Sequence, residues 1–346
     1  MPIHQTRTKE VGAPQAAGNP TGYVLPPQGI QNIVYRAADG NLIELWRDGS
    51  GHRGTGNVSG VVAAPKAAGD PSCYFENSTG NIVVPYRGVD GHVHTLYWAT
   101  GPVGHDALSQ SVNAPQTAGR PVGYYNPTTT RHLVVYRSPD GHLRALSWMG
   151  PGVAVHEDLT GGANAIKAAG DPAAYLDTKR NTNIVVYRAV DGNIRSIYWS
   201  EGPSGLDDLS GYAQAPDAAG DPVAYFTDAS DTHQVTYRST DGHIRELYCT
   251  GVAPVAQIDL TAAANAPVAG GDPTAWFDAH ARLKHVVYRG QDNHLYDLRW
   301  IPGQAVSCVD LTMEGAAPQA SGTPFGFSGP TYQHLTYRGV DGEFMN

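Results

Sequence analysis

Aromatic residues recur at matching places in this sequence of 346 residues, and their type and spacing could support ligand chemistry. A flat aromatic ring beside polar groups suits a sugar, because the C–H face of the sugar stacks on the ring while its hydroxyls form directed hydrogen bonds. The alternative is that the rings fill a core between packed sheets. The recurring aromatics are Trp98, Trp148, Trp199 and Trp300, with Tyr97, Tyr198 and Tyr248 at the place just before.

A second recurring group follows predicted tight turns and consists of His92, His142, His243 and His294. Imidazoles spread over separate repeats would lie too far apart to bind one metal ion, whose ligands must come within roughly 2 Å of it. We therefore expect these histidines to form a polar rim or to contact a ligand, and not to act in catalysis.

Acidic residues precede a proline at matching places, as Asp70, Asp171, Asp221 and Asp272. If the strand after each proline is the innermost of its sheet, these acids circle one mouth of a central channel. Their carboxylates could hold a cation such as calcium; alternatively, each Asp caps its own turn or pairs with a neighbouring Arg. Because Arg120 occupies the same place in another repeat, we expect no metal and no cofactor, with calcium as the alternative.

Motifs that define common enzyme classes are missing from the sequence. It contains no Gly-x-Ser-x-Gly elbow, no His-Glu-x-x-His pair and no phosphate-binding loop. We therefore expect a protein without enzymatic activity. The alternative to this expectation is an enzyme, a hydrolase or lyase with one site over a central channel.

A repeated hairpin must position these groups. A Tyr-Arg pair ends one β-branched run, and successive copies of its arginine are 51, 50, 51, 50, 51 and 49 residues apart. An Asp stands three positions after each Arg, usually followed by Gly, which predicts a tight turn before a second alternating run. This spacing also predicts a bidentate Arg–Asp pair within each hairpin. The arginines are Arg36, Arg87, Arg137, Arg188, Arg238, Arg289 and Arg338.

Each repeat contains four predicted strands. The hairpin supplies two, a Gly-Pro turn opens one before it, and Asp-Leu-Thr or Asp-Leu-Ser marks one after it, as at Asp158–Thr160. Four strands in about fifty residues are typical of a propeller blade. We predict a single all-β domain, a seven-bladed β-propeller of four-stranded antiparallel blades, with approximate blade bounds 11–60, 61–110, 111–160, 161–211, 212–262, 263–313 and 314–346 plus 1–10.

The last repeat ends within its third predicted strand, at Asp341–Asn346. Alignment of the N-terminus with a complete repeat places Gln5–Lys9 on Asp207–Gly211, where the fourth strand is expected. We therefore predict that an N-terminal strand completes the last blade and closes the ring, which would remove exposed sheet edges at the join.

Composition restricts the partners and the compartment. Charged residues make up 16% of the chain and the formal net charge is -9, so neither disorder nor a nucleic-acid surface is predicted. No apolar run is long enough for a signal peptide or for insertion into a membrane. The cysteines Cys73, Cys249 and Cys308 fall at unrelated places in their repeats, which argues against a disulfide framework. We expect a soluble protein synthesised in the cytoplasm, with non-classical release as an open alternative; the oligomeric state is left open.

The hairpin Asp241–Tyr248, with the sequence Asp-Gly-His-Ile-Arg-Glu-Leu-Tyr, resembles blades of the fungal fucose-binding lectins of the Aleuria type. Its pattern is also similar to seven-bladed bacterial lectins of the Photorhabdus type and to tectonin-like repeats. In the Aleuria-type family, fucose binds between blades through an Arg, a Glu and aromatics, without metal. The resemblance implies ligand-binding roles for Glu246 and Glu44. The repeats that depart from it at this place carry Thr95, Ala145, Ser196 and, loosely, Asp297.

Together, these features predict a lectin that binds glycans or glycoconjugates at repeated sites between blades. Several weak sites on one molecule would bind a multivalent surface much more tightly than each site alone. The alternative outside the lectins and enzymes is a protein-interaction scaffold that uses one flat face of the ring.

Overall fold

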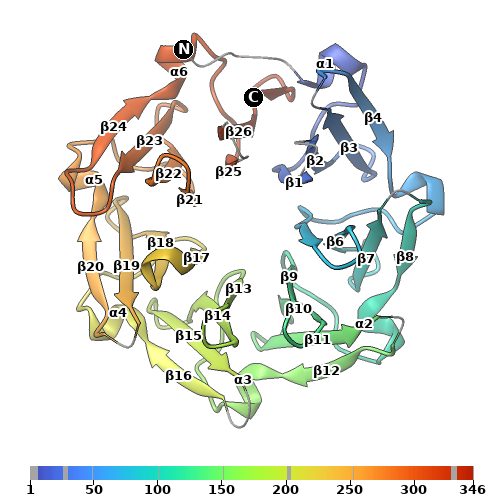
Figure 1. Ribbon diagram of the computed structural model, residues 1–346, viewed down its shortest axis with the longest axis horizontal. Helices are drawn as coiled ribbons and strands as arrows, with labels where there is room; N and C mark the ends of the chain where they lie inside the picture. Colours follow the sequence, from blue (N-terminus) through green and yellow to red (C-terminus); the bar gives the residue numbers. More distant parts are fainter. Residues whose placement is uncertain are drawn as a thin grey trace.

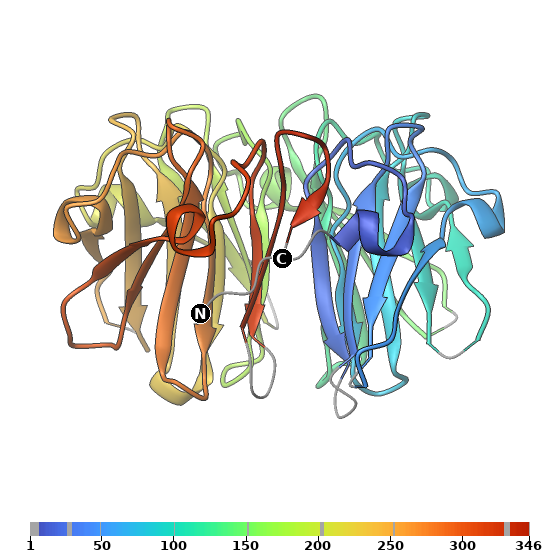
Figure 2. The same cartoon turned by 90° about the horizontal axis from the view of Figure 1, so that it is seen from above.

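The computed structural model describes residues 7–25, 30–48, 50–99, 101–150, 152–200, 204–251, 253–328 and 333–345. The described strands form seven antiparallel sheets arranged radially around a common centre (Figure 1). In each sheet the strands follow chain order, with the first strand innermost (Figure 1). Figure 2 shows the strands running between two opposite rims of the ring. The predicted seven-bladed, all-β propeller is therefore confirmed.

The strands of the first four blades are, in chain order, β1 (Thr21–Leu25), β2 (Ile30–Arg36), β3 (Leu42–Arg47) and β4 (Arg53–Asn57); β5 (Tyr74–Glu76), β6 (Asn81–Arg87), β7 (Val93–Trp98) and β8 (Gly104–Asp106); β9 (Val122–Asn126), β10 (Arg131–Arg137), β11 (Leu143–Met149) and β12 (Val155–Asp158); β13 (Ala173–Asp177), β14 (Thr182–Arg188), β15 (Ile194–Trp199) and β16 (Gly205–Asp208). Those of the last three are β17 (Val223–Thr227), β18 (Thr232–Arg238), β19 (Ile244–Thr250) and β20 (Ala256–Asp259); β21 (Thr274–Asp278), β22 (Leu283–Arg289), β23 (Leu295–Trp300) and β24 (Ser307–Asp310); β25 (Phe325–Ser328), β26 (Gln333–Arg338) and β27 (Phe344–Met345). The short helices are α1 (Arg7–Val11), α2 (Leu108–Ser111), α3 (Leu159–Gly162), α4 (Leu209–Tyr212), α5 (Leu260–Ala263) and α6 (Leu311–Gly315), with 3-10 turns η1 (Gly60–Val62) and η2 (Asp228–Ser230).

The central hairpin of each blade forms as its sequence predicts. In blade four, Val185 pairs with Ile197 across β14 and β15, and both side chains are fully buried. The turn needs a positive φ, which Gly192 supplies at 91°. In blade six Asn293 takes that place at a φ of 66°, because Asn tolerates the left-handed region better than most residues.

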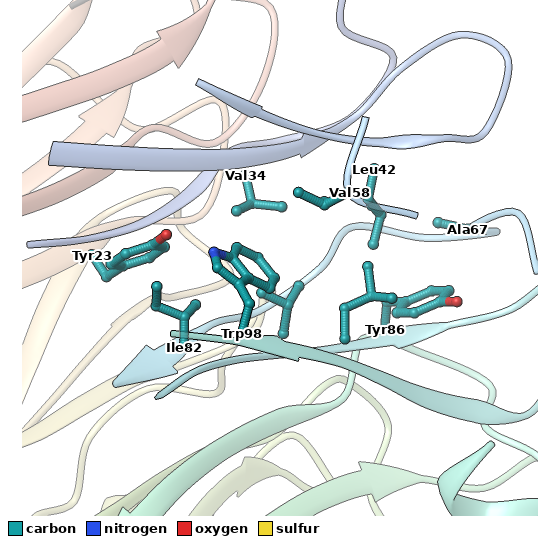
Figure 3. Close-up of a cluster of buried hydrophobic side chains, with 10 residues drawn as sticks. Tyr23, Val34, Leu42, Val58, Ala67, Ile82, Tyr86 and Trp98 are labelled. Carbon is teal, nitrogen blue, oxygen red and sulfur yellow. The ribbon is translucent and has the colours of Figure 1, made fainter. Parts of the chain in front are cut away.

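The tyrosine of every Tyr-Arg pair is a buried anchor. In blade two the Tyr86 hydroxyl donates a hydrogen bond of 3.0 Å to the Pro65 carbonyl, and the same bond recurs in every blade. Hydrophobic clusters fill the spaces between adjacent blades. Figure 3 shows one of them, between blades one and two, where Trp98 lies among Tyr23, Val34 and Ile82.

The Asp-Leu-Thr motif ends the fourth strand and begins a helix, so the prediction that it lies within the strand is wrong. In blade three, β12 ends at Asp158, whose side chain accepts a hydrogen bond from the Gly161 N–H at the start of α3. This is N-capping, the function for which Asp is favoured at helix starts. The Thr160 hydroxyl accepts a hydrogen bond from the Leu143 N–H, which joins the helix to the third strand.

The predicted N-terminal strand is not confirmed, although the N-terminal segment does dock on the last blade. Arg7–Val11 forms α1, so the described part of the predicted strand Gln5–Lys9 is helical; Gln5 and Thr6 lie outside the described residues. Helix α1 contacts β27, as α2 to α6 contact the third strands of their own blades. Blade seven therefore has three described strands and a helix from the opposite end of the chain.

The arginine of the Tyr-Arg pair does not bind the Asp of its own hairpin, contrary to the prediction. In blade one, Arg36 donates to the Ala17 carbonyl at 3.0 Å, which ties the hairpin to the loop before the first strand. The hairpin Asp instead accepts from its own turn and from a later arginine, as in the 2.8 Å pair of Asp140 with Arg144. Across the described residues, none of the helices has the length and apolar character needed to cross a bilayer.

Candidate functional site: two crevices between blades

Two hollows lie between neighbouring blades at equivalent places. Crevice A, of about 930 Å³, lies between blades two and three, and crevice B, of about 470 Å³, lies between blades four and five. In each, one blade contributes residues from all four of its strands and from the helix after them. The next blade contributes its second and third strands and the turn after the third. The repeat thus sets the shape of both crevices, and individual residues set their chemistry.

One wall of each crevice is a tyrosine ring that lies against a glycine. Tyr97 on β7 is paired with Gly104 on β8, and a Cβ at Gly104 would come within 2.3 Å of the ring. Tyr198 on β15 and Gly205 on β16 repeat this arrangement, again at 2.3 Å. Because glycine has no side chain, the ring can fold across the neighbouring strand and still line the crevice; Tyr97 remains 37% exposed.

A carboxylate stands two residues after each glycine, at Asp106 in crevice A and Asp207 in crevice B. Asp207 lies close enough to Tyr198 for its negative charge to be the main cause that raises the pKa of that hydroxyl. Burial raises the pKa of Asp207 itself. Each crevice therefore presents a hydrogen-bond acceptor beside an aromatic ring.

The opposite wall carries a histidine that is held on both of its ring nitrogens. In crevice A, His132 Nδ1 lies 3.0 Å from the Tyr74 hydroxyl and its Nε2 lies 3.5 Å from the Glu76 carboxylate. Burial lowers the pKa of His132, and the charge of Glu76 opposes this effect, so the ring is mainly neutral at pH 7. The equivalent residues of crevice B are His233, Tyr175 and Asp177, with distances of 3.1 Å and 3.4 Å.

Small residues line both crevices at a place that a larger residue fills at the interface of blades five and six. Thr95 and Ser196 line crevices A and B from the third strands of their blades. At the matching place in blade five, buried Glu246 pairs with Lys284 of blade six at 2.7 Å. The Lys284 ammonium also lies 5.2 Å from the centre of the Trp300 ring, so this interface is filled by an ion pair and an indole.

The two crevices differ in their remaining walls. In crevice A, Trp148 stacks on His132 with ring centres 4.8 Å apart and an interplanar angle of 7°. In crevice B, Cys249 takes the place of that tryptophan, and Tyr248 lies beside it. The rim of crevice B is closed by Arg180, which bonds Asp177 of its own blade and Asp231 of the next blade.

Four of the predicted aromatic residues lie in these crevices, and three do not. Tyr97 and Trp148 line crevice A, and Tyr198 and Tyr248 line crevice B. Trp98 and Trp300 are only 8% exposed and pack in the interior, whereas Trp199 is half-buried against the core of blades three and four. The residues implied by the resemblance also lie outside the crevices: Glu246 pairs with Lys284, and Glu44 accepts a 2.5 Å hydrogen bond from Tyr23.

The four predicted histidines lie at the other rim of the ring. They follow the turn between the second and third strands, whereas the crevices use turns at the opposite ends of these antiparallel strands. His142, His243 and His294 each bond the Asp that caps the helix of the same blade, at 2.8–3.0 Å. His92 bonds Ser109 at 3.1 Å in the same way. These contacts fasten each hairpin to its own helix.

The predicted ring of acids does line the channel mouth, in a cavity of about 530 Å³. The acids do not cap their own turns, and each reaches to the preceding blade. The predicted pairing with a neighbouring Arg is found for Asp171 with Arg137 at 3.6 Å and for Asp272 with Arg238 at 3.3 Å. Asp171 accepts from the Arg120 N–H at 2.9 Å, and Asp272 accepts from the Asp221 N–H at 3.2 Å. Asp70 accepts from the Asn19 amide at 2.9 Å. In the described part of the chain, no group of three or more His, Cys, Asp or Glu residues is placed to hold a metal ion.

Comparisons with known proteins identify the fold class. Searches against protein-family models and against curated proteins found no match. Among solved structures, the chain is similar to BP39L lectin from Burkholderia pseudomallei, with 11% identity, a TM-score of 0.74, and coverage of 95% of this chain and 94% of that one. It is also similar to AofleA from Arthrobotrys oligospora (13% identity, TM-score 0.56, 89% of each chain). The lectin of Aleuria aurantia, described as a six-bladed β-propeller with a novel fucose recognition mode, gives 13% identity and a TM-score of 0.53 over 84% of this chain and 94% of that one. The chain is thus a seven-bladed β-propeller whose fold is shared with lectins.

The sequence-based predictions do not single out two groups of crevice residues. The first is the tyrosine, glycine and aspartate that form one wall of each crevice, and the second is the pair of histidines His132 and His233 on the opposite walls. A signal for the first was present, because Gly104-His-Asp106 and Gly205-Leu-Asp207 occur at matching places in blades two and four only. A signal for the second was also present, since His132 and His233 stand four residues before the tyrosine of the Tyr-Arg pair. Both departures from the repeat coincide with the hollow interfaces.

Proposed function

We propose that this protein is a lectin that binds carbohydrate in crevices A and B without catalysis. The observation that carries this proposal is the repetition of one set of groups in two separate crevices: a tyrosine ring, a carboxylate beside it and an oriented neutral histidine. An aromatic face with a few directed polar groups is the arrangement that a sugar ring requires. The shared fold of proteins whose printed descriptions call them lectins also supports the proposal.

Repetition also favours binding over catalysis and over a protein-interaction scaffold. A catalytic centre requires one assembled set of reacting groups, whereas equivalent sites on one rigid ring raise avidity for a multivalent surface. Crevices of several hundred Å³ are of the size that holds small molecules. A flat protein-binding face would not need them.

The test combines a glycan array with calorimetry on the hits. We expect two sites per chain, one for each crevice. Tyr97→Ala should abolish the site in crevice A, Tyr198→Ala the site in crevice B, and the double variant all binding. Tyr97 is 37% exposed and Tyr198 is half-buried, so a retained cooperative melting transition in each variant serves as the folding control. Val61→Ala, at a residue that is 72% exposed outside both crevices, is the surface control.

Three outcomes would reject the proposal. They are no binding to any glycan by folded protein, binding that survives in the double tyrosine variant, and cleavage of a bound glycan during long incubation. Capture of a protein partner in the absence of glycan binding would favour the scaffold alternative.

A further inference from the structure

Each crevice contains one carboxylate that the fold leaves unpaired. Asp106 and Asp207 line crevices A and B, and neither side chain makes a hydrogen bond or ion pair with any residue that the structure describes. The side chain of Asp106 is exposed and that of Asp207 is half-buried. Most hairpin and capping acids of the same blades are fully engaged, as Asp208 is by Gly211 and Asn193. The two unpaired acids are therefore available to a ligand.

The other acid of each crevice is already satisfied. In crevice A, Glu76 accepts hydrogen bonds from Ser78 at 2.7 Å and from Asn81 at 3.3 Å, and it faces His132. In crevice B, Asp177 accepts from Arg180 at 2.9 Å. These acids orient the histidines, and they leave the charge of the second carboxylate uncompensated.

Among the described residues that line the two crevices, no free Lys or Arg balances the unpaired carboxylates. The residues that line crevice A include neither Lys nor Arg. Crevice B is lined by Arg180, but its guanidinium makes three hydrogen bonds, of 2.7–2.9 Å, to Asp177 and Asp231. Each crevice thus offers an unmatched negative charge next to a tyrosine ring, and both features attract a cation.

We propose that both crevices select sugars that carry a free, protonated amine, with the ammonium on the unpaired carboxylate and the apolar sugar face on the tyrosine ring. The inference rests on the proposed function and specifies its ligand class. A carboxylate or sulfate on the sugar would face an unpaired acid without a free cation to bind it, so acidic sugars are rejected. An N-acetylated sugar keeps the same ring but loses the charge.

The test is calorimetry at low salt, at a pH where the amine is protonated, with matched sugars. Glucosamine, galactosamine and mannosamine are compared with their neutral parents, their N-acetyl forms and the corresponding uronic acids. A partly exposed ion pair predicts about threefold to fivefold tighter binding of the amine than of the parent. The uronic acids should bind most weakly.

The variants separate a local contact from the overall charge. In the Asp106→Asn/Asp207→Asn double variant, the ratio of the amine's affinity to that of its neutral parent should fall to within about twofold, although both sugars bind more weakly than to the unchanged protein. Glu157→Gln removes the same charge at the equivalent, exposed place of blade three, which lines neither crevice, and should retain the preference. Two results would overturn this inference and leave the lectin proposal standing. One is equal affinity for glycans with and without the amine, and the other is a preference for the amine that survives in the double variant. If the unchanged, folded protein binds no glycan at all, this inference and the lectin proposal are both rejected.

Discussion

The Thr8 hydroxyl accepts a hydrogen bond of 3.1 Å from the Phe344 N–H, and so joins residues from opposite ends of the chain in one blade. The same hydroxyl donates to the Glu343 carboxylate. In the other six blades a Ser or Thr makes the equivalent bond to the first residue of the third strand. Thr8 therefore supplies the seventh copy of a contact that is local everywhere else.

The first prediction concerns this contact. Thr8→Val should lower the free energy of unfolding by about 1–3 kcal/mol, because the buried Phe344 N–H loses its partner. Thr160→Val removes the equivalent bond within blade three and should cost a similar amount. Urea unfolding followed by circular dichroism measures both. An unaffected Thr8→Val protein beside a destabilised Thr160→Val protein would contradict the docking of α1 on the last blade.

The second prediction concerns the glycines under the tyrosine rings. Gly205→Ala should move the Tyr198 ring, since the new Cβ would otherwise lie 2.3 Å from it, and should weaken sugar binding in crevice B about tenfold. Gly104→Ala should act in the same way on crevice A. Gly56→Ala, at a fourth-strand glycine with open space around its Cα, is the matched control and should leave binding unchanged. Calorimetry that finds equal affinities for all three variants would argue against the tyrosine rings as ligand platforms.

The third prediction concerns the interface of blades five and six. Lys284→Ala should destabilise the fold by about 3–5 kcal/mol, because it leaves buried Glu246 without a counter-ion. The pKa of Glu246 is already raised by burial, and Lys284 opposes that shift, so it should rise further in the variant. The Lys284→Met/Glu246→Leu double variant should recover most of the lost stability, because apolar residues need no partner. A double variant no more stable than Lys284→Ala would show that the pair does not act as a unit.

The fourth prediction concerns the channel mouth. Burial, together with the charges of Asp171 and Asp272, raises the pKa of Asp221 to about 6, above its value of roughly 4 in an unfolded chain. The folded state then binds the proton more tightly, so this group stabilises the protein below about pH 4 and the effect is lost as the pH rises through 6. Asp221→Asn should therefore be more stable than the parent at pH 7, by on the order of 1 kcal/mol after allowing for partial exposure.

Urea unfolding of both proteins between pH 4 and pH 8 tests this linkage. The stability difference between Asp221→Asn and the parent should grow with pH up to about 6 and then level off. A difference that does not change with pH would show that the carboxyl of Asp221 is not perturbed by its neighbours.

The sequence predicts the repeat, the hairpins and the ring of acids because these follow from turn chemistry and from alternation. Asp191-Gly192 requires a tight turn wherever it occurs, and Val185 and Ile197 must face a core. Asp158 is itself a signal for the helix after the fourth strand, since Asp is favoured at helix N-caps. Hydrophobic periodicity does not reveal this helix, because four residues are too few to show it.

The accessibility of the tryptophans could not be predicted from their own positions. Trp98 is paired across the hairpin with Ile82 and is buried, whereas Trp148 is paired with His132 and lines crevice A. The outcome depends on side-chain volume in an adjacent blade, about fifty residues away in the sequence. The partner of Arg36 was missed for a related reason, because a backbone carbonyl leaves no trace in a residue pattern.

Crevices A and B belong to one closed ring and are separated by the interface of blades three and four. Their separation is therefore set by the circumference of the ring, and no hinge can adjust it. The fixed distance between the crevices should make binding depend on the spacing of sugars on a surface. A surface whose sugars match this distance will bind one protein molecule through both crevices. A surface with another spacing will bind each protein molecule through a single crevice, and the second crevice can then link it to a neighbouring surface.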